Sequence, residues 1–411
     1  MFKKSLVVMG VRITTLLVKF ALTLFIAKFL TLEDLGWFGL VSSAGIAAAP
    51  ILGLGCIQTL SRTAVRADSK DLVAPINHYL TYVICLYSVL LGALLLSGLA
   101  HPLLVLLIWA VVLMEHLGNE SYQLLVSRAI PLRANLLYFF RGGLWGLIYM
   151  PLAYAMPELR NLETLFLFWL VGGVVAFMGA FLAIRKWPWH QARLNLREGI
   201  LWTIRETRAA RALYISGVCE TLSMHSDRFI VTALLGPETT GIYVFFLQIG
   251  TALANLHYSG VVQMSRPAFV RTAAESPPRL LHLFWKTSRI AFLSTALFSV
   301  VALAGIDYFL SLVNKQALSE WTVLFYFVLI SFNLNVFAEL QKMAMYALHA
   351  DRAIMRLTVI KFVIAIALLA SFIALFGLIG AGISLVCIAT IRVLIQFLWL
   401  NTDKNIPAKD V

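Results

Sequence analysis

Apolar stretches of about 20 residues recur from one end of this sequence to the other. A helix of that length crosses a hydrocarbon core about 30 Å thick. Within lipid every backbone polar group must bond inside its own segment, so such stretches predict a bundle of helices. We therefore expect an all-α polytopic membrane protein with about twelve transmembrane helices, at residues 6–30, 36–60, 77–100, 102–127, 134–156, 163–184, 213–236, 240–263, 288–310, 319–346, 357–376 and 378–400.

The composition argues against a separate soluble domain. Of the 411 residues, 61% are hydrophobic and 13% are charged, whereas soluble domains carry about 25% charged residues. The four cysteines lie inside apolar stretches without a CxxC pair, so we expect no disulfide, metal site or cofactor. The first stretch continues to Leu30 without a cleavage site of small residues, which predicts a retained helix and not a secretory signal.

The basic residues predict the orientation of the helices. One set of loops and tails holds 23 of the 33 lysines and arginines, whereas the opposite set holds only Arg160 and Lys315. By the positive-inside rule we expect both termini in the cytoplasm. The same bias accounts for most of the net charge of +13, so no nucleic-acid partner is needed.

Two similar external turns indicate an internal repeat. A shift of 205 residues places Leu30, Glu33, Gly36 and Phe38 on Leu235, Glu238, Gly241 and Tyr243. A later match, at a shift of 219, places Glu120 on Glu339. Parallel six-helix repeats are an established transporter architecture. We expect one lobe at 1–184, a second at 213–411, and a basic amphipathic cytoplasmic linker at 185–212, lying at the membrane surface as a passive connector.

Charged residues inside the predicted spans are candidate functional residues. On insertion scales each cation costs roughly 2.5–3.5 kcal/mol near a helix centre, so it should face a cavity or a partner. Four spans carry a polar face, which predicts a hydrated central cavity. The cations are Arg12, Lys19, Lys28, Arg141, Arg228, Lys342, Lys361 and Arg392, and the acids are Glu115, Glu120, Glu220, Asp227 and Glu339.

Some of these charges have a purely structural alternative. Lys28, Lys361 and Arg392 lie nearer helix ends and can extend to the interface. Arg228 can pair with Glu220 or Asp227, and Glu339 can neutralise Lys342. By contrast, Arg12, Lys19 and Arg141 have no acid on their own helix, which favours contact with a ligand. Cations outnumber acids in this set, so an entering anion would meet groups suited to phosphate.

The sequence also resembles a known family. The resemblance lies in residues 11–30, in Asp34-Leu-Gly36 and Phe38-Gly-Leu40, and in the seventh span from Ser226-Asp-Arg-Phe-Ile230 through Gly236-Pro to Gly241-Ile-Tyr243. These segments resemble bacterial O-antigen flippases of the Wzx type. Those flippases belong to the multidrug/oligosaccharidyl-lipid/polysaccharide exporter superfamily, which includes MATE drug exporters and lipid II flippases.

The resemblance implies a flippase of the bacterial inner membrane that serves lipopolysaccharide biosynthesis. By alternating access it would move an undecaprenyl-diphosphate-linked oligosaccharide to the periplasmic leaflet, with antiport of protons or Na⁺ and contact with polysaccharide polymerase machinery. The family's first-helix cations, here Arg12 and Lys19, would engage the diphosphate or sugar, and Asp227-Arg228 begins its seventh-helix pattern. We expect substrate contacts from Arg12, Lys19, Arg141, Arg228, Lys342 and Lys361, and ion coupling or inter-lobe pairs from Glu115, Glu120, Glu220, Asp227 and Glu339.

Two other functions compete with this interpretation. A MATE-like exporter of cationic drugs would favour a cavity rich in lone acids and aromatic residues. The net-positive cavity expected here would instead repel cationic substrates. A membrane glycosyltransferase or polymerase that uses the same lipid carrier would need sizeable loops with acids or metal ligands. The external loops here have only a handful of residues and the cytoplasmic loops are basic, so we expect a transporter and not an enzyme.

Overall fold

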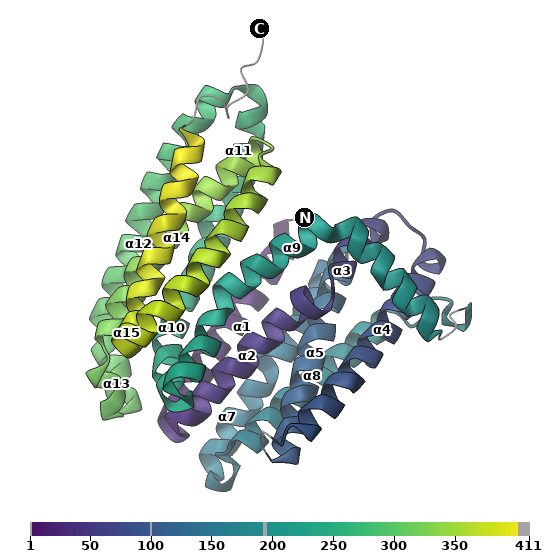
Figure 1. Cartoon of the computed structure of the whole chain (residues 1–411), viewed down its shortest axis with the longest axis horizontal. Helices are drawn as coiled ribbons and strands as arrows, with labels where there is room; N and C mark the ends of the chain where they lie inside the picture. Colours follow the sequence, from purple (N-terminus) through teal and green to yellow (C-terminus); the bar gives the residue numbers. More distant parts are fainter. Residues whose placement is uncertain (1, 99–100, 192–194, 402–411) are drawn as a thin grey trace. The chain divides into compact units, whose positions relative to one another are not determined.

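The computed structural model describes residues 2–98, 101–191 and 195–401. Within these residues the chain is helical and has no strand (Figure 1). Nine helices in the described residues have the length and hydropathy to cross a membrane. The prediction of an all-α polytopic membrane protein is confirmed. Residues 192–194 of the predicted linker, and the end of the chain from 402, lie outside the described residues.

The helices form two compact units. Unit 1 consists of residues 1–22 and 38–222, and unit 2 of residues 23–37 and 223–411. Helices α1 (Phe2–Phe29), α2 (Leu32–Leu52) and α9 (Leu196–Leu235) each contribute to both units. The remaining elements of unit 1 are α3 (Cys56–Ala64), α4 (Ser69–Leu96), α5 (Pro102–Ser127), α6 (Pro131–Phe139), η1 (Phe140–Leu144), α7 (Trp145–Ala155), η2 (Pro157–Leu159), α8 (Leu162–Ile184) and η3 (Trp189–Gln191).

Unit 2 is built on α14 (Val323–Ala347), which packs against α10 (Pro237–His257), α12 (Pro277–Val313) and α15 (Asp351–Leu400). Its other elements are η4 (Tyr258–Val262), α11 (Gln263–Glu275) and α13 (Gln316–Glu320). Gly377 interrupts α15 with a φ of 58° and a ψ of −138°, so α15 is two helices joined at that residue. This break coincides with the predicted boundary between the last two spans.

Most predicted spans coincide with helices, with two differences. The span predicted at 36–60 is divided into α2 and α3, because Leu54 and Gly55 adopt positive φ between them. The span predicted at 213–236 is the second half of the continuous 40-residue helix α9, whose first half carries most of the predicted linker. Neither α9 nor α10 is among the nine helices that meet the length and hydropathy criteria.

Local sequence signals explain several helix boundaries. Thr31 and Asp34 exchange backbone-to-side-chain hydrogen bonds of 2.9 and 3.0 Å at the start of α2, which satisfies two free backbone N–H groups. The Asn161 side chain accepts from the Thr164 backbone at the start of α8. Helices α5, α6 and α10 begin with proline, whose missing N–H costs nothing at that position.

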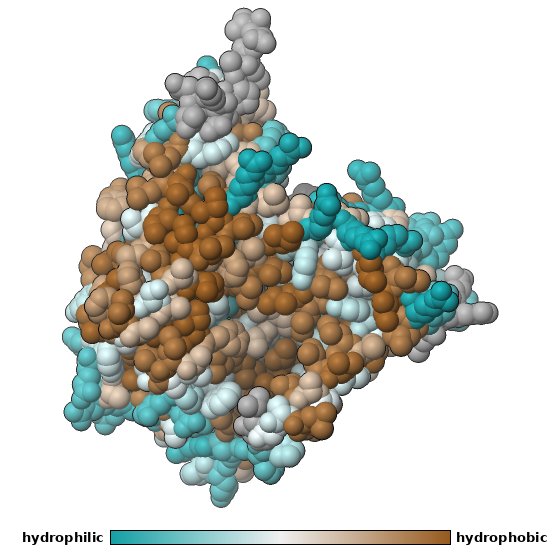
Figure 2. Space-filling model, viewed as in Figure 1, coloured by the Kyte–Doolittle hydropathy of each residue, from teal (hydrophilic) through white to brown (hydrophobic). Residues whose placement is uncertain are grey.

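Apolar side chains both fill the units and cover them. In unit 1 Trp202 of α9 packs on a cluster of residues from α3, α4 and α5, and in unit 2 Phe269, Phe284 and Phe332 form the centre of a second cluster. Many large apolar side chains are nevertheless exposed, such as Leu293 of α12, and Figure 2 shows hydrophobic residues over much of the visible surface. A surface of this kind is expected where helices face lipid.

The two turns that indicate the internal repeat contact each other in unit 2. A Cβ atom on Gly36 would lie 2.0 Å from the Pro237 carbonyl oxygen, and one on Gly241 would lie 1.8 Å from that of Leu32. The contact is therefore reciprocal and requires glycine at both positions. Lys315 contacts the first of these turns, because its ammonium group donates a hydrogen bond to the Leu30 carbonyl. Burial lowers the pKa of Lys315, while Asp34 and Glu238 act in the opposite direction.

Candidate functional site

Three of the predicted ligand-facing cations, Arg12, Lys19 and Arg141, lie in unit 1 around two tyrosines. Arg141 belongs to η1, a single π-helical turn between α6 and α7. Such turns widen the helix locally and are frequent at functional sites. The Arg141 side chain is only 4% exposed and points towards α5. The sequence therefore places a guanidinium group inside the unit, where it must be held by other polar groups.

Helix α5 supplies the groups that hold Arg141. Its guanidinium donates to the Glu115 carbonyl over 2.9 Å and to the Asn119 side-chain oxygen over 2.7 Å. Its Nε atom lies 3.4 Å from the Glu115 carboxylate, which also accepts from the Trp169 indole over 3.0 Å. These contacts fix Arg141 in one orientation. A Cβ on Gly118 would lie 2.3 Å from an Arg141 nitrogen, so glycine makes room for the guanidinium at this point.

Two tyrosines complete the cluster. The Arg141 guanidinium lies 5.6 Å from the Tyr138 ring centre, and the Lys19 ammonium lies 5.4 Å from the same ring. Arg12 stands 6.0 Å from the Tyr122 ring and donates both to the Tyr122 hydroxyl and, over 2.8 Å, to the Asn135 side chain. The two rings are 6.1 Å apart. Cations placed over aromatic faces are stabilised by the negative potential of the ring.

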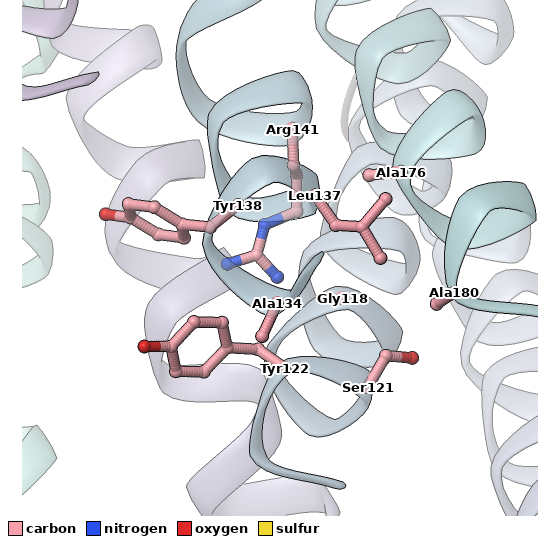
Figure 3. A pocket seen from close by; sticks show the side chains of 9 residues that line it. All are labelled: Gly118, Ser121, Tyr122, Ala134, Leu137, Tyr138, Arg141, Ala176 and Ala180. Atoms are coloured by element: carbon pink, nitrogen blue, oxygen red, sulfur yellow. The ribbon is translucent and has the colours of Figure 1, made fainter. Parts of the chain in front are cut away.

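A pocket adjoins this cluster. Figure 3 shows the Arg141 guanidinium directed between the rings of Tyr122 and Tyr138, with Ala134 beside Tyr122 and with Ala176 and Ala180 on the side away from the rings. The contacts described above bring three cations and one carboxylate, that of Glu115, to these two rings. An anionic ligand could neutralise such a cluster of cations, and guanidinium groups suit phosphate oxygens.

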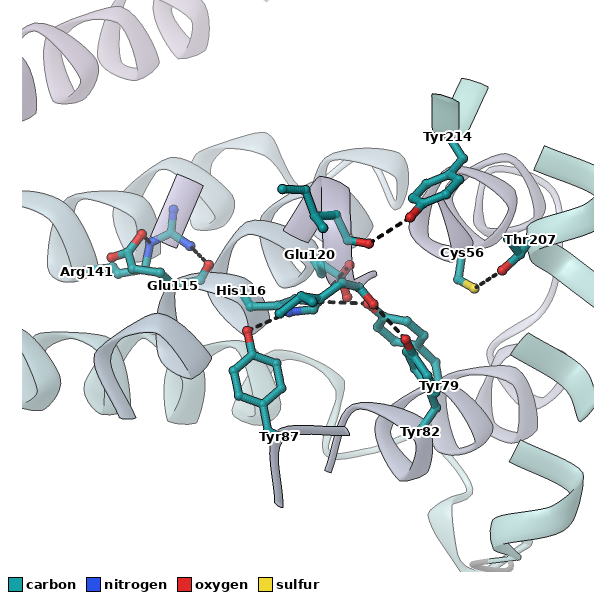
Figure 4. Close-up of polar contacts among 12 residues, drawn as sticks. Cys56, Tyr79, Tyr82, Tyr87, Glu115, His116, Glu120, Arg141, Thr207 and Tyr214 are labelled. Carbon is teal, nitrogen blue, oxygen red and sulfur yellow. Dashed lines mark hydrogen bonds and ion pairs between the residues drawn. The ribbon is translucent and has the colours of Figure 1, made fainter. Parts of the chain in front are cut away.

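Glu120 belongs to a different group of unit 1. It is buried beside His116, and Figure 4 shows both residues on the α5 face that meets α4, away from Glu115 and Arg141. The Glu120 oxygen and the His116 Nε2 atom are 3.3 Å apart. The structure thus separates Glu115, which pairs with Arg141, from Glu120, which does not.

In unit 2 the seventh predicted span holds a second charged group. The buried residues Asp227 and Arg228 are adjacent and lie 3.6 Å apart at their charged atoms. The Asp227 carboxylate accepts from the Tyr243 hydroxyl over 2.9 Å, and Arg228 lies 3.0 Å from a His225 ring nitrogen. Glu220, one predicted alternative partner of Arg228, is half-buried on the same helix and has contacts of its own.

The remaining predicted residues lie on the last helices of unit 2. Arg392 forms an ion pair with Glu339 and donates to Asn335 over 3.1 Å. Lys361 is buried, Lys342 is half-buried, and both have polar or electrostatic partners. Lys28 is exposed near the end of α1, as expected for a side chain that extends to the interface. Within the described residues no group of three side chains is arranged to hold a metal ion.

Several residues of the candidate site cannot be identified from the sequence. Tyr122, Tyr138 and Asn135 lie in predicted spans, but only the packing of α1, α5 and α6 shows that they surround Arg12 and Lys19. A tyrosine in an apolar span is common, so its type alone indicates nothing. The cations were identified because charge inside a membrane is rare.

Comparison with known proteins supports the fold. No protein-family model matches the chain, and no curated protein matches its sequence. Among solved structures, an inward-facing multidrug resistance MATE family transporter of the MOP superfamily is 16% identical, with a TM-score of 0.71 and 93% of each chain covered. The lipid II flippase MurJ, in an inward closed conformation, is 13% identical, with a TM-score of 0.71, 99% of this chain and 89% of MurJ covered. A MATE structure in the straight conformation gives a TM-score of 0.60 at 16% identity, covering 97% and 94%. The chain thus has the fold shared by these transporters.

Proposed function

We propose that this protein is a flippase for an undecaprenyl-diphosphate-linked oligosaccharide. It moves an O-antigen or similar repeat unit from the cytoplasmic to the periplasmic leaflet of the bacterial inner membrane, by alternating access and with ion coupling. The distribution of basic residues supports a cytoplasmic position for both termini. The likeness to MurJ supports a lipid-linked substrate, and the likeness to MATE transporters supports transport in general.

One observation carries the proposal: three cations surround two tyrosines inside membrane-spanning helices, beside the carboxylate of Glu115. A diphosphate supplies negative charge and acceptor oxygens, which guanidinium and ammonium groups bind. Tyr122 and Tyr138 add hydroxyl donors and flat ring surfaces, which suit sugar hydroxyls and apolar sugar faces. In this proposal the cluster of Arg12, Lys19 and Arg141 holds the headgroup while the polyprenyl chain remains in the bilayer.

The charged groups of α9, α14 and α15 have a separate role in the proposal. Arg228, Lys342 and Lys361 contact the headgroup at another stage of transport, and the acids Glu220, Asp227 and Glu339 contribute to coupling or to ion pairs that change between states. Asp227 and Glu339 are already engaged with Arg228 and Arg392. A ligand phosphate competes for the same cations, which is a physical route from binding to rearrangement.

The test is transbilayer movement of labelled undecaprenyl-diphosphate oligosaccharide in proteoliposomes. Lys19→Ala is compared with Lys28→Ala, because both remove a cation from α1 but only Lys19 lies at the tyrosine cluster. A hydrogen bond to a charged group contributes about 1.5–3 kcal/mol, so we expect Lys19→Ala to slow movement by about ten- to a hundredfold. Lys28→Ala should retain the wild-type rate.

Two results would contradict the proposal. Equal rates for both variants would remove the tyrosine cluster from the substrate path. No lipid movement by the wild type, together with efflux of cationic dyes, would favour the MATE-like drug exporter, which the TM-score of 0.71 to a multidrug transporter makes the leading competitor.

A further inference from the structure

Helix α5 carries a second polar group that the anion site does not use. His116 is completely buried and Glu120 is 5% exposed, and both side chains face α4 (Figure 4). Glu115, Asn119 and Tyr122 turn instead to the arginines described above. The two groups therefore occupy different faces of one helix.

Both nitrogens of the His116 ring have a partner. The Tyr79 hydroxyl lies 2.9 Å from Nε2 and the Tyr87 hydroxyl lies 3.0 Å from Nδ1. Helix α4 supplies both tyrosines, and the Trp109 indole of α5 donates to the Tyr87 carbonyl over 2.9 Å. These bonds fix the position of the ring and leave its proton content open, because each hydroxyl can donate or accept.

The carboxyl group of Glu120 is in the opposite situation. Neither of its buried oxygens has a hydrogen-bond partner of regular geometry, although the Tyr79 hydroxyl stands beside it. Its Oε1 atom instead lies 3.3 Å from His116 Nε2. A carboxylate facing an unprotonated ring nitrogen would bring two lone pairs together inside a buried site, which is unfavourable. A neutral imidazole that carries its proton on Nε2 removes the conflict but leaves the carboxylate charge buried. One further proton, giving imidazolium with carboxylate or imidazole with carboxylic acid, also cancels that charge.

None of the neighbouring groups described next supplies a positive charge that could take the place of that proton. Cys56 of α3 and Tyr79, Tyr82 and Tyr87 of α4 interact electrostatically with Glu120. Thiols and phenols are ordinarily neutral at pH 7. From α9, Tyr214 and Glu206 face Tyr82 and Cys56, and the only formal charge among them is negative. Loss of the proton therefore leaves one uncompensated negative charge at this site.

We propose that His116 and Glu120 form the coupling proton site of this transporter, holding one exchangeable proton. In the loading step a hydronium ion transfers its proton to His116 Nε2 or Glu120 Oε1 and leaves as water. In the release step the same N–H or O–H bond breaks and the proton returns to water on the other side. No other bond changes. The assignment rests on the proposed flippase function.

The placement on α5 gives this proton a route to the anion site. His116 directly follows Glu115, the carboxylate that holds Arg141, and Glu120 directly follows Asn119, which accepts from Arg141. A change of charge at His116 and Glu120 that shifts or rotates α5 must alter the contacts of Arg141. Proton release and substrate binding thus act on two faces of the same helix. In this proposal both events bias one movement of α5, which couples the two sites.

The test measures the distribution of labelled undecaprenyl-diphosphate oligosaccharide between leaflets under a gradient of one pH unit, with the membrane potential held at zero. One proton exchanged per lipid against one pH unit corresponds to about a tenfold ratio, with the lipid collecting in the leaflet that faces the acidic side. We expect that ratio for the wild type and no accumulation of lipid on the acidic side for Glu120→Gln and His116→Gln. Glu198→Gln, an exposed carboxyl on α9, serves as the control and should match the wild type.

The outcomes separate the two proposals. A wild type that equilibrates lipid without any response to the pH gradient overturns the proton site and leaves the flippase intact, as does a Glu120→Gln variant that still concentrates lipid tenfold. A wild type that moves no lipid overturns the flippase. In that case pH-induced infrared difference spectra of the purified protein decide: carboxyl and imidazole bands missing from Glu120→Gln and His116→Gln support the proton site, and spectra identical to the wild type overturn it.

Discussion

At the scale of single residues, the structure shows how this chain tolerates ionised groups inside a membrane. Arg141 is paired with Glu115, 26 positions earlier, and Glu339 is paired with Arg392, 53 positions later. The sequence identified these charges, because ionisable residues stand out in apolar spans. It did not identify these partners, because side chains on different helices meet only when the packing is known. Spacing along one helix suggested Lys342 for Glu339, and only tertiary contact reveals Arg392.

A glycine opposite Arg141 provides a test at this scale. The Cβ atom of Gly118→Ala would lie 2.3 Å from an Arg141 nitrogen and 2.6 Å from its Cδ atom. Since Arg141 is held by Glu115 and Asn119, it cannot move without losing one of those bonds. The loss of one hydrogen bond to a charged group predicts a decrease in lipid movement on the order of tenfold. The rate of lipid movement in proteoliposomes measures the effect.

Gly92→Ala is the matched control for this prediction. Gly92 also lies in a membrane-spanning helix of unit 1, and a Cβ atom there meets no atom within 4 Å. We expect it to leave both expression and lipid movement unchanged. If Gly118→Ala moved lipid as fast as Gly92→Ala, Arg141 would not need its present position for transport.

At the scale of elements, hydropathy and length predicted where helices lie but not where they break. The predicted span at 102–127 coincides with α5, and that at 163–184 differs from α8 by one residue. The division of the second span into α2 and α3 was missed, because residues 36–60 remain apolar through the break. The continuity of α9 was also missed, because a basic segment reads as a loop until its packing through Trp202 is known.

The break inside α15 predicts a purely conformational effect. Gly377 has a φ of 58° and a ψ of −138°, a region open essentially to glycine alone, and a Cβ atom there would touch nothing within 4 Å. Gly377→Ala should therefore lower the free energy of unfolding by about 1–3 kcal/mol through backbone strain. Thermal unfolding of the purified protein in detergent measures this change.

Gly305→Ala controls for the loss of a glycine as such. Gly305 lies within α12, and a Cβ atom there makes only an ordinary contact of 3.5 Å with Phe309. Alanine favours helix over glycine, so this variant should be as stable as the wild type or slightly more stable. A Gly377→Ala protein that unfolded at the same temperature as Gly305→Ala would show that the two helices of α15 need no glycine between them.

At the scale of the whole molecule, composition was sufficient to predict a helical membrane protein, and the similarity to MATE transporters and MurJ supports that fold. The glycan and the coupling ion were beyond reach, because they depend on pocket shape and on contacts between helices. The orientation in the membrane rests on the basic residues alone, which makes it directly testable.

Single cysteines in a variant without the four native cysteines test the orientation. Arg66, between α3 and α4, and Glu158, between α7 and α8, are both exposed. The positive-inside rule places Arg66 in the cytoplasm and Glu158 in the periplasm. In intact cells we expect a membrane-impermeant maleimide to label Glu158→Cys and to label Arg66→Cys only after lysis. The reverse pattern would invert the topology and, with it, the direction of transport.

The reciprocal contact between Gly36 and Gly241 makes each turn depend on the other for its backbone position. A Cβ atom on either turn collides with the backbone of the other. A second substitution at the opposite glycine could not relieve that collision, because the obstacle is main chain and not a side chain. Neither turn can therefore accept a side chain at this point unless the other turn moves away.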